Sequence, residues 1–224
     1  MLSMQTDEFL ESIQKGNLSR INQLLETNPG LANSKTKNGI SALLLALYHG
    51  RHEIALVIAA KKPMLDIFEA SVLGKLEQVR NLIGRDPSLV NSYSPDGFTP
   101  VALAAYLGQK DVTEYLLEKG ANVNAMAKNA TGFTPLTGAI ANNHVEISKI
   151  LVKSGADVNH RYEGGVSPLM EASLNGNLEL VRFLLENGAD STAKTADGKT
   201  PMSFAREKNH VEVIDALRRH GGHF

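Results

Sequence analysis

Hydrophobic residues recur along the chain at the spacing of short amphipathic helices. Val112, Tyr115 and Leu116 fall on one face of such a helix, and residues 180–184 repeat the arrangement further on. A shorter stretch rich in small residues, such as residues 102–105, precedes these helices, and a Gly or Asn separates the two. The pattern therefore predicts a series of helix pairs in which the small residues let neighbouring pairs approach closely.

A four-residue string precedes most of these helix pairs. It reads GFTP at 97–100 and 132–135, GVSP at 165–168, GKTP at 198–201 and GISA at 39–42. Glycine tolerates the positive φ of a tight turn, the Thr or Ser hydroxyl caps a helix N-terminus, and proline suits the first helical position. We therefore expect each string to form the tip of a hairpin, here called a finger, followed by the start of a helix.

The hydroxyl residue of the string recurs at a nearly constant interval. Its copies stand at Thr99, Thr134, Ser167 and Thr200. The glycines of the Gly-Ala steps at positions 120, 155 and 188 keep the same spacing. Two independent markers that share a period of about 33 residues indicate a solenoid of stacked units, because no single unit can bury its apolar face alone.

The unit resembles the ankyrin repeat. The match rests on D-G-x-T-P, the small-residue helix, G-x-x-[DE]-[VI] and L-L-x-x-G-A-[DN]-V-N, and it covers nearly the whole chain. The resemblance implies an all-α ankyrin-repeat solenoid of about seven helix-turn-helix repeats with short β-hairpin fingers. That family usually has His after TPL. Here the position holds Ala102, Thr137, Met170 and Ser203, so we expect its polar clamp to be absent or differently made.

The start of the chain is a second copy of a later segment. NGISALLLALYHG at 38–50 aligns with DGFTPVALAAYLG at 96–108, and the same offset aligns Gly16 with Gly74 without a gap. We expect one domain over residues 1–224 with repeats at roughly 6–35, 36–65, 66–93, 94–126, 129–161, 162–194 and 195–221. The first and third repeats lack the finger, so residues 60–67 should run from one helix pair to the next without a hairpin.

Composition narrows the function classes. The 23 basic and 24 acidic residues of the 224-residue chain give a net charge of −1, which argues against a strongly basic nucleic-acid surface. The absence of cysteine excludes disulfides and thiolate metal sites. No signal peptide is recognisable, and no apolar run approaches the roughly 18 residues of a membrane helix. We expect a cytoplasmic monomer that binds neither nucleic acid nor membrane.

Motifs for catalysis, metals or cofactors are incomplete. Gly198, Lys199 and Thr200 resemble the end of a phosphate-binding loop, but Ala193 stands where that loop needs glycine. His49 and His52 have a spacing near that of a zinc site, but the Gly between them breaks the helix that such a site requires. His144 and His210 are interpreted as contacts at a helix start. We therefore predict no catalytic residue, no metal, no cofactor and no enzyme activity.

The resemblance implies that fingers and first helices form a concave face that binds another protein. The candidate partner-binding residues are Tyr48, Phe98, Tyr106, Leu107, Met126, Phe133, Arg161, Tyr162 and Leu174. Aromatic residues with one Arg are typical of binding surfaces, although the finger rings could instead pack on neighbouring fingers. The favoured function is a protein–protein interaction scaffold that binds an unknown partner through the concave face of repeats 4–6. The alternatives are a regulatory or inhibitory subunit of a partner enzyme, or a hydrolase with a site not visible in the sequence.

Overall fold

The computed structural model describes residues 2–221, which form helices joined by turns and loops. The α-helices are α1 (Leu2–Lys15), α2 (Leu18–Thr27), α3 (Ala42–Tyr48), α4 (His52–Lys61), α5 (Ile67–Val72), α6 (Leu76–Arg85), α7 (Pro100–Tyr106), α8 (Lys110–Glu118), α9 (Pro135–Ala141), α10 (Val145–Lys153), α11 (Pro168–Leu174), α12 (Leu178–Glu186), α13 (Pro201–Glu207) and α14 (Val211–Arg219). Three short 3-10 helices lie in the connections: η1 (Pro29–Asn33), η2 (Pro87–Asn91) and η3 (Glu163–Gly165). The predicted all-α solenoid of helix pairs is confirmed.

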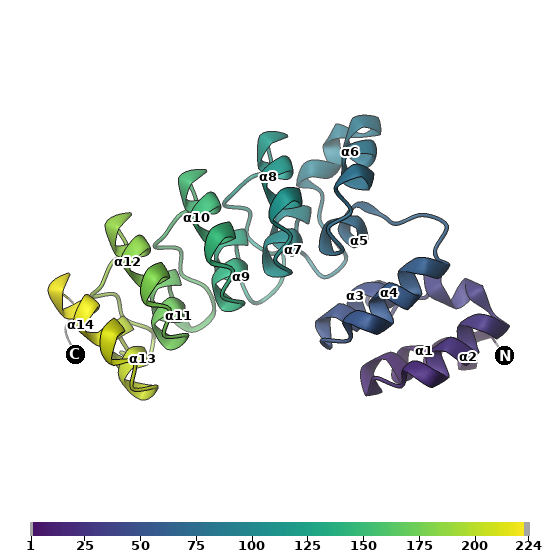
Figure 1. The fold of residues 1–224 in the computed structure, drawn as a ribbon, viewed down its shortest axis with the longest axis horizontal. Helices are drawn as coiled ribbons and strands as arrows, with labels where there is room; N and C mark the ends of the chain where they lie inside the picture. Colours follow the sequence, from purple (N-terminus) through teal and green to yellow (C-terminus); the bar gives the residue numbers. More distant parts are fainter. Residues whose placement is uncertain (1, 222–224) are drawn as a thin grey trace.

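The helix pairs of α5–α14 stack side by side into an arch. Figure 1 shows the odd-numbered helices of this part on the inner side of the arch and the even-numbered helices on the outer side. Leu116, Leu151 and Leu184, which the periodicity places between the two layers, are all 0% exposed. The predicted register of the second helix in each pair is therefore confirmed.

The Thr and Ser residues of the repeated strings cap helices as the sequence predicts. Their side chains accept hydrogen bonds from the backbone three residues on, at the starts of α7, α9, α11 and α13. The polar clamp is made differently from the family pattern. The Thr137 hydroxyl accepts from the Thr134 N–H at 2.8 Å, and the Ser203 hydroxyl accepts from the Thr200 N–H at 3.1 Å. These reciprocal bonds form capping boxes that satisfy free N–H groups at the helix start.

The fingers are tighter than the predicted β-hairpins. Each is a turn closed by a backbone hydrogen bond, such as the one of 2.9 Å from Ser94 N–H to the Phe98 carbonyl. Two isolated β-bridges are found within residues 2–221, Lys35 with Ser41 and Tyr162 with Val166. Because a helix starts directly after each turn, the two sides of the finger are too short to pair as a ladder of strands.

The internal duplication relates whole elements of the fold. The offset that aligns residues 38–50 with 96–108 carries α2, η1 and α3 onto α6, η2 and α7, with matching first and last residues. The first helix departs from this relation, because α1 has 14 residues and α5 has six. α1 thus begins at Leu2, ahead of the start that the repeat pattern predicts for the first unit.

The missing finger of the third unit bends the solenoid. Residues 62–66 connect α4 to α5 without a hairpin, and Figure 1 shows α1–α4 turned across the direction of α5–α8. The turn brings the two flanking fingers together, because a Cβ on Gly39 would lie 3.1 Å from Pro95. Val72 and Leu103 are buried in the same cluster as the core of α1–α4. The fingers on either side of the third unit therefore lie next to each other, although that unit has no finger of its own.

A buried ion pair holds this connection. Lys62 Nζ lies 2.7 Å from Glu69 Oε1, and the two side chains are 8% and 1% exposed. The second oxygen of Glu69 accepts from the Asp66 N–H at 3.2 Å, while Asp66 caps α5 by accepting from the Glu69 N–H at 2.9 Å. The bend is thus fixed by specific polar contacts rather than by loop length alone.

Asparagine side chains bridge successive repeats in the part of the solenoid that follows this junction. Asn124 donates to the Gly155 carbonyl at 3.0 Å and accepts from the Asp157 N–H at 2.8 Å. Asn91 and Asn159 make the same pair of bonds one repeat earlier and one repeat later. These bonds tie each of the repeats to its neighbour, a role of asparagine that was not predicted from the sequence.

Candidate binding pocket

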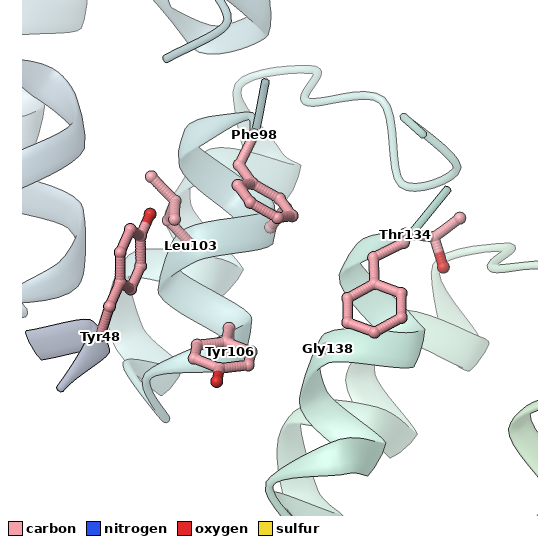
Figure 2. A pocket seen from close by; sticks show the side chains of 8 residues that line it. Tyr48, Phe98, Leu103, Tyr106, Thr134 and Gly138 are labelled. Atoms are coloured by element: carbon pink, nitrogen blue, oxygen red, sulfur yellow. The ribbon is translucent and has the colours of Figure 1, made fainter. Parts of the chain in front are cut away.

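Four of the predicted partner-binding side chains lie around one pocket, seen in Figure 2. Tyr48 ends α3, Phe98 belongs to the finger before α7, Tyr106 ends α7, and Phe133 belongs to the finger before α9. The pocket has a volume of about 210 Å³, and its remaining walls are Ala102, Leu103, Thr134 and Gly138. Aromatic rings from three different helix pairs thus converge on one apolar hollow.

Gly138 provides much of the room in this pocket. It occupies the position in α9 that Leu103 occupies in α7, so a large side chain is replaced by none. A Cβ on Gly138 would lie 3.5 Å from the Cβ of Tyr106, which shows how closely that residue covers the helix. Glycine in the middle of a helix is unfavourable by roughly 0.5–1 kcal/mol relative to alanine. A glycine inside a predicted helix is visible in the sequence, but Gly138 was not among the predicted site residues.

Tyr48 reaches the pocket because the third unit has no finger. Its hydroxyl donates to Asp96 Oδ2 at 2.6 Å, although the two residues are far apart in the sequence. Burial and the hydrogen bond to Asp96 raise the pKa of Tyr48 far above its usual value, so the hydroxyl stays protonated and keeps donating. The ring remains 36% exposed, and that of Tyr106 is 38% exposed. Tyr48 is therefore held in place while part of its surface faces solvent.

The aromatic row continues from the pocket to the next repeat. The Tyr162 ring packs edge-on against Phe133, with centroids 4.9 Å apart at an angle of 89°. The Tyr162 hydroxyl donates to Glu171 Oε2 at 2.8 Å. Burial, together with the nearby Glu171 charge, raises the pKa of Tyr162, so it also stays protonated. Tyr162 thus supports the Phe133 wall of the pocket from behind.

The other predicted residues do not line this pocket. Leu107 is half-buried against the core of α1–α4, and Leu174 lies at the end of α11, where its carbonyl contacts His210. Met126 is 56% exposed. The Arg161 guanidinium donates to the carbonyls of Lys194 and Gly165, so its charge is engaged within the fingers.

The finger rings also pack against the rest of the protein, which resembles the alternative interpretation in which they pack on neighbouring fingers. Phe98 and Phe133 are half-buried, and Phe98 packs against the core of α1–α4. Each ring therefore has one side in contact with the protein and takes part in the pocket with another. Packing between fingers positions these rings and does not remove them from the surface.

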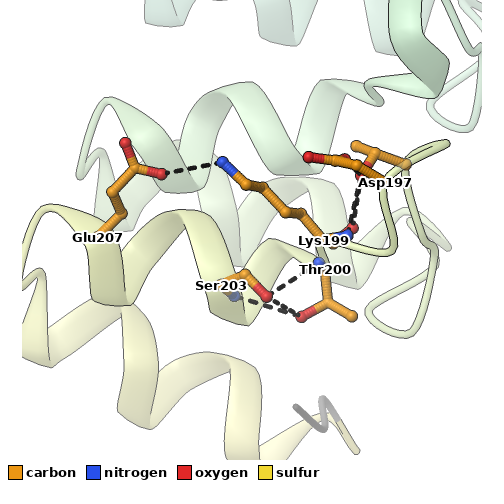
Figure 3. A network of polar contacts seen from close by, with 6 residues as sticks. Asp197, Lys199, Thr200, Ser203 and Glu207 are labelled. Carbon is orange, nitrogen blue, oxygen red and sulfur yellow. Dashed lines mark hydrogen bonds and ion pairs between the residues drawn. The ribbon is translucent and has the colours of Figure 1, made fainter.

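The remaining motifs have structural roles. Lys199 Nζ lies 3.5 Å from Glu207 Oε2. Thr200 is bonded to Ser203 at the start of α13, as Figure 3 shows, which is a helix cap and not a phosphate loop. His144 and His210 each place Nε2 near a carbonyl at the end of the inner helix of the preceding repeat. The distances are 3.1 Å from His144 to Tyr106 O at the end of α7, and 3.0 Å from His210 to Leu174 O at the end of α11. They join neighbouring repeats, beyond the helix-start role that the sequence analysis gives them.

The described part of the chain contains no cluster of side chains of the kind that ligates a metal ion. Over residues 2–221, no three His, Asp or Glu side chains are grouped to hold a metal ion. None of the helices in that range has the length and apolar character required to cross a membrane. What the pocket offers is a concave apolar surface of the kind that receives a side chain or a small apolar group.

Comparisons with known proteins identify the repeats. Residues 67–162 match a family model described as ankyrin repeats (3 copies), and residues 151–205 match one described as ankyrin repeats (many copies). The chain is similar to ankyrin repeat and SAM domain-containing protein 6 of Rattus norvegicus, with 41% identity over 26% of this chain and 7% of that protein. It is also similar to the target of rapamycin complex 2 subunit AVO2 of Saccharomyces cerevisiae, with 27% identity over 58% of this chain and 33% of that protein.

A third relative is the DNA-binding protein RFXANK of Homo sapiens, with 33% identity over 29% of this chain and 25% of that protein. The matched segments thus span between 7% and 33% of the length of these three relatives. Ankyrin repeats generally mediate protein–protein interaction, and the pocket lies among the fingers and inner helices. The repeat models, the relatives and the fold agree: the chain belongs to the ankyrin repeat family.

Proposed function

We propose that this protein is an interaction scaffold that binds a partner protein through the concave face, with the aromatic pocket at its centre. The observation that carries the proposal is the convergence of Tyr48, Phe98, Tyr106 and Phe133 on one apolar hollow. Buried aromatic anchors and the pockets that receive them dominate the energetics of protein interfaces. Monomeric proteins rarely leave such apolar surface open without using it.

The proposal moves the centre of the surface toward the N-terminus. The sequence favours repeats 4–6, whereas the pocket takes its walls from the second, fourth and fifth predicted repeats. Tyr162 and Glu171 extend the same row into the sixth. A partner segment that follows the concave face would therefore pass over the pocket and along this row.

A regulatory subunit of a larger assembly is the second candidate function. One relative is named as a subunit of a complex, and that match covers 58% of this chain. In such a role the same pocket would hold a partner enzyme, and this chain would supply no catalytic group of its own. Nucleic-acid binding is not proposed, although another relative is named a DNA-binding protein. Arg161, which precedes Tyr162 in the sequence, is bonded to finger carbonyls.

Removing the two finger rings tests the proposal. A partner is first isolated by affinity capture with the whole chain and then titrated against the double variant Phe98→Ala/Phe133→Ala. We expect the dissociation constant to rise at least about thirtyfold, the loss associated with interface hot spots of about 2 kcal/mol.

Phe183→Ala is the matched control, since it removes a half-buried ring from α12 in the outer layer. It should leave affinity unchanged. Thermal melts of all variants separate a loss of binding from a loss of folding. Equal affinity of the double variant and the wild type, with both folded, would leave the rings with a structural role alone.

A further inference from the structure

We infer that the partner presents a bulky apolar residue flanked by Lys or Arg, so that the apolar side chain fills the pocket and the cations meet Asp96 and Glu171. This inference rests on the proposed function and specifies the chemistry of the partner. It is based on the carboxylates that border the aromatic row.

The walls of the pocket require an apolar anchor. Its lining is aromatic and aliphatic except for Thr134 and the two tyrosine hydroxyls. The Thr134 hydroxyl accepts from the Thr137 N–H as a helix cap, and the Tyr48 hydroxyl is bonded to Asp96. A polar group inserted here would lose its bonds to water and find few replacements, whereas an apolar side chain would not.

Carboxylates stand at both ends of the row. Asp96 holds the Tyr48 hydroxyl beside the pocket, and Glu171 holds the Tyr162 hydroxyl behind Phe133. Their bonds come from neutral hydroxyls, so no cation offsets either charge: Tyr48 and Ser94 donate to Asp96, and Tyr162 donates to Glu171. Across residues 2–221, the ion pairs formed by other carboxylates include neither of these two.

Three cations of the neighbouring fingers contact other groups. Lys128 places its ammonium 3.9 Å from the centre of the Tyr93 ring, and Arg161 donates to backbone carbonyls. Lys199 pairs with Glu207 at 3.5 Å. Asp96 and Glu171 are therefore two carboxylates along the row that these three cations do not pair with. Charge complementarity then favours a basic segment and disfavours an acidic one, in which like charges would be brought together.

A peptide selection tests this inference before any partner is identified. A phage library of random decapeptides is selected on the immobilised whole chain, and enriched sequences are synthesised. We expect a large apolar residue with Lys or Arg close to it in sequence. Affinity of the synthetic peptides should fall as salt is raised, because exposed charge pairs are screened.

Charge-removing variants then locate the cations. Asp96→Asn and Glu171→Gln keep an oxygen that can accept from the tyrosine hydroxyl while removing the charge. Each should weaken the selected peptide about fivefold and reduce the salt dependence, the effect of a partly exposed ion pair. Glu186→Gln, which removes an exposed charge at the end of α12, is the matched control and should change neither.

The outcomes separate the two proposals. Enriched peptides that are neutral or acidic, or that bind Asp96→Asn and Glu171→Gln as tightly as the wild type, overturn the basic-partner inference. If those peptides still need Phe98 and Phe133, the pocket remains the binding site. Peptides that bind Phe98→Ala/Phe133→Ala as well as the wild type, or a selection with no enrichment over a blank surface, overturn the proposed function itself.

Discussion

Gly138 shapes the pocket at the scale of a single residue. It is buried in the middle of α9 and has no side chain where the equivalent residue of α7, Leu103, has a large one. The Tyr106 side chain therefore lies directly on the helix. A helix-interior glycine lowers stability, and here it both accommodates the Tyr106 ring and leaves the pocket without a side chain from α9. This arrangement is consistent with a pocket kept open for a ligand.

Gly138→Ala should therefore stabilise the protein. A Cβ at this position meets its nearest neighbours at 3.5 Å, an ordinary van der Waals distance, so the helix gains without a clash. We expect the free energy of unfolding to rise by about 0.5–1 kcal/mol in urea denaturation. Gly84→Ala in α6, where a Cβ meets nothing within 4 Å, is the control and should give a similar gain. A loss of stability at Gly138 alone would show that Tyr106 cannot accommodate the methyl group.

Leu151 tests the packing between the two helix layers. It is 0% exposed at the centre of the C-terminal core. Leu151→Ala should lower the free energy of unfolding by about 2–5 kcal/mol, since it removes apolar contacts and leaves a cavity. The neighbouring Val152→Ala, at a half-buried position, should have a smaller effect. A loss below roughly 0.5 kcal/mol for Leu151→Ala would contradict the assigned register.

At the scale of elements, local signals explain which parts of the fold the sequence predicts. Caps, prolines and turn residues act within a few positions, so helix pairs and their starts could be assigned one repeat at a time. The β-hairpins were over-predicted, because their length depends on where the next helix begins. The turn of α1–α4 was not predicted, since it arises from contacts between fingers that are distant in the sequence, such as Gly39 with Pro95.

The candidate site shows the same division. Its four rings were found because Tyr48 and Tyr106, and likewise Phe98 and Phe133, occupy equivalent positions in different repeats. Asp96 and Glu171 were missed because their roles depend on the tyrosine hydroxyls that the fold brings to them, and Gly138 was missed although its place inside a helix is visible in the sequence. The meeting of Tyr48 with Asp96 in particular requires the missing finger and the closed junction together.

The ion pair at the junction should be one of the strongest polar contributions to the fold. Glu69→Gln leaves the Lys62 ammonium without its partner in a site where both side chains are nearly buried. We expect a loss of about 3–5 kcal/mol in unfolding free energy. Glu146→Gln breaks an exposed pair with Lys149 and should cost less than about 1 kcal/mol. The double variant Lys62→Met/Glu69→Gln should recover much of the loss, and no recovery would mean that the charge itself is not the cause.

At the scale of the whole molecule, we expect the junction to divide the solenoid into two cooperative parts. Asparagine bridges tie the repeats from η2 onward, while the core of α1–α4 forms a separate cluster. Val72 and Leu103 belong to this cluster from beyond the bend, and Phe68, Leu73, Phe98 and Leu107 pack against it. Because repeats contact only their neighbours, a weak interface limits cooperativity.

Hydrogen exchange should reveal this division. We expect amides of α1–α4 to exchange through an opening of lower free energy than amides of α7–α12. Glu69→Gln should lower the protection of α1–α4 more than that of α9–α12. Equal protection of the helices on the two sides of residues 62–66, unchanged in Glu69→Gln, would show that the chain opens as one unit.

The bend and the pocket together define the surface that the molecule offers to a partner. The N-terminal helices supply Tyr48, the repeats beyond the junction supply the other three rings, and Asp96 links the two parts. Binding at the pocket should thus be sensitive to both the finger rings and the space beside Gly138.

The most direct test of this claim is the affinity of a captured partner, or of a selected peptide, for Gly138→Leu measured by isothermal titration calorimetry. The new side chain would occupy the space beside α9 that is equivalent to the space of Leu103 beside α7. It would thereby fill the pocket without breaking the helix. We predict a folded protein, as judged by its melting curve, and an affinity lowered at least about tenfold. A folded Gly138→Leu that binds with the affinity of the wild type would contradict the assignment of the pocket as the binding site.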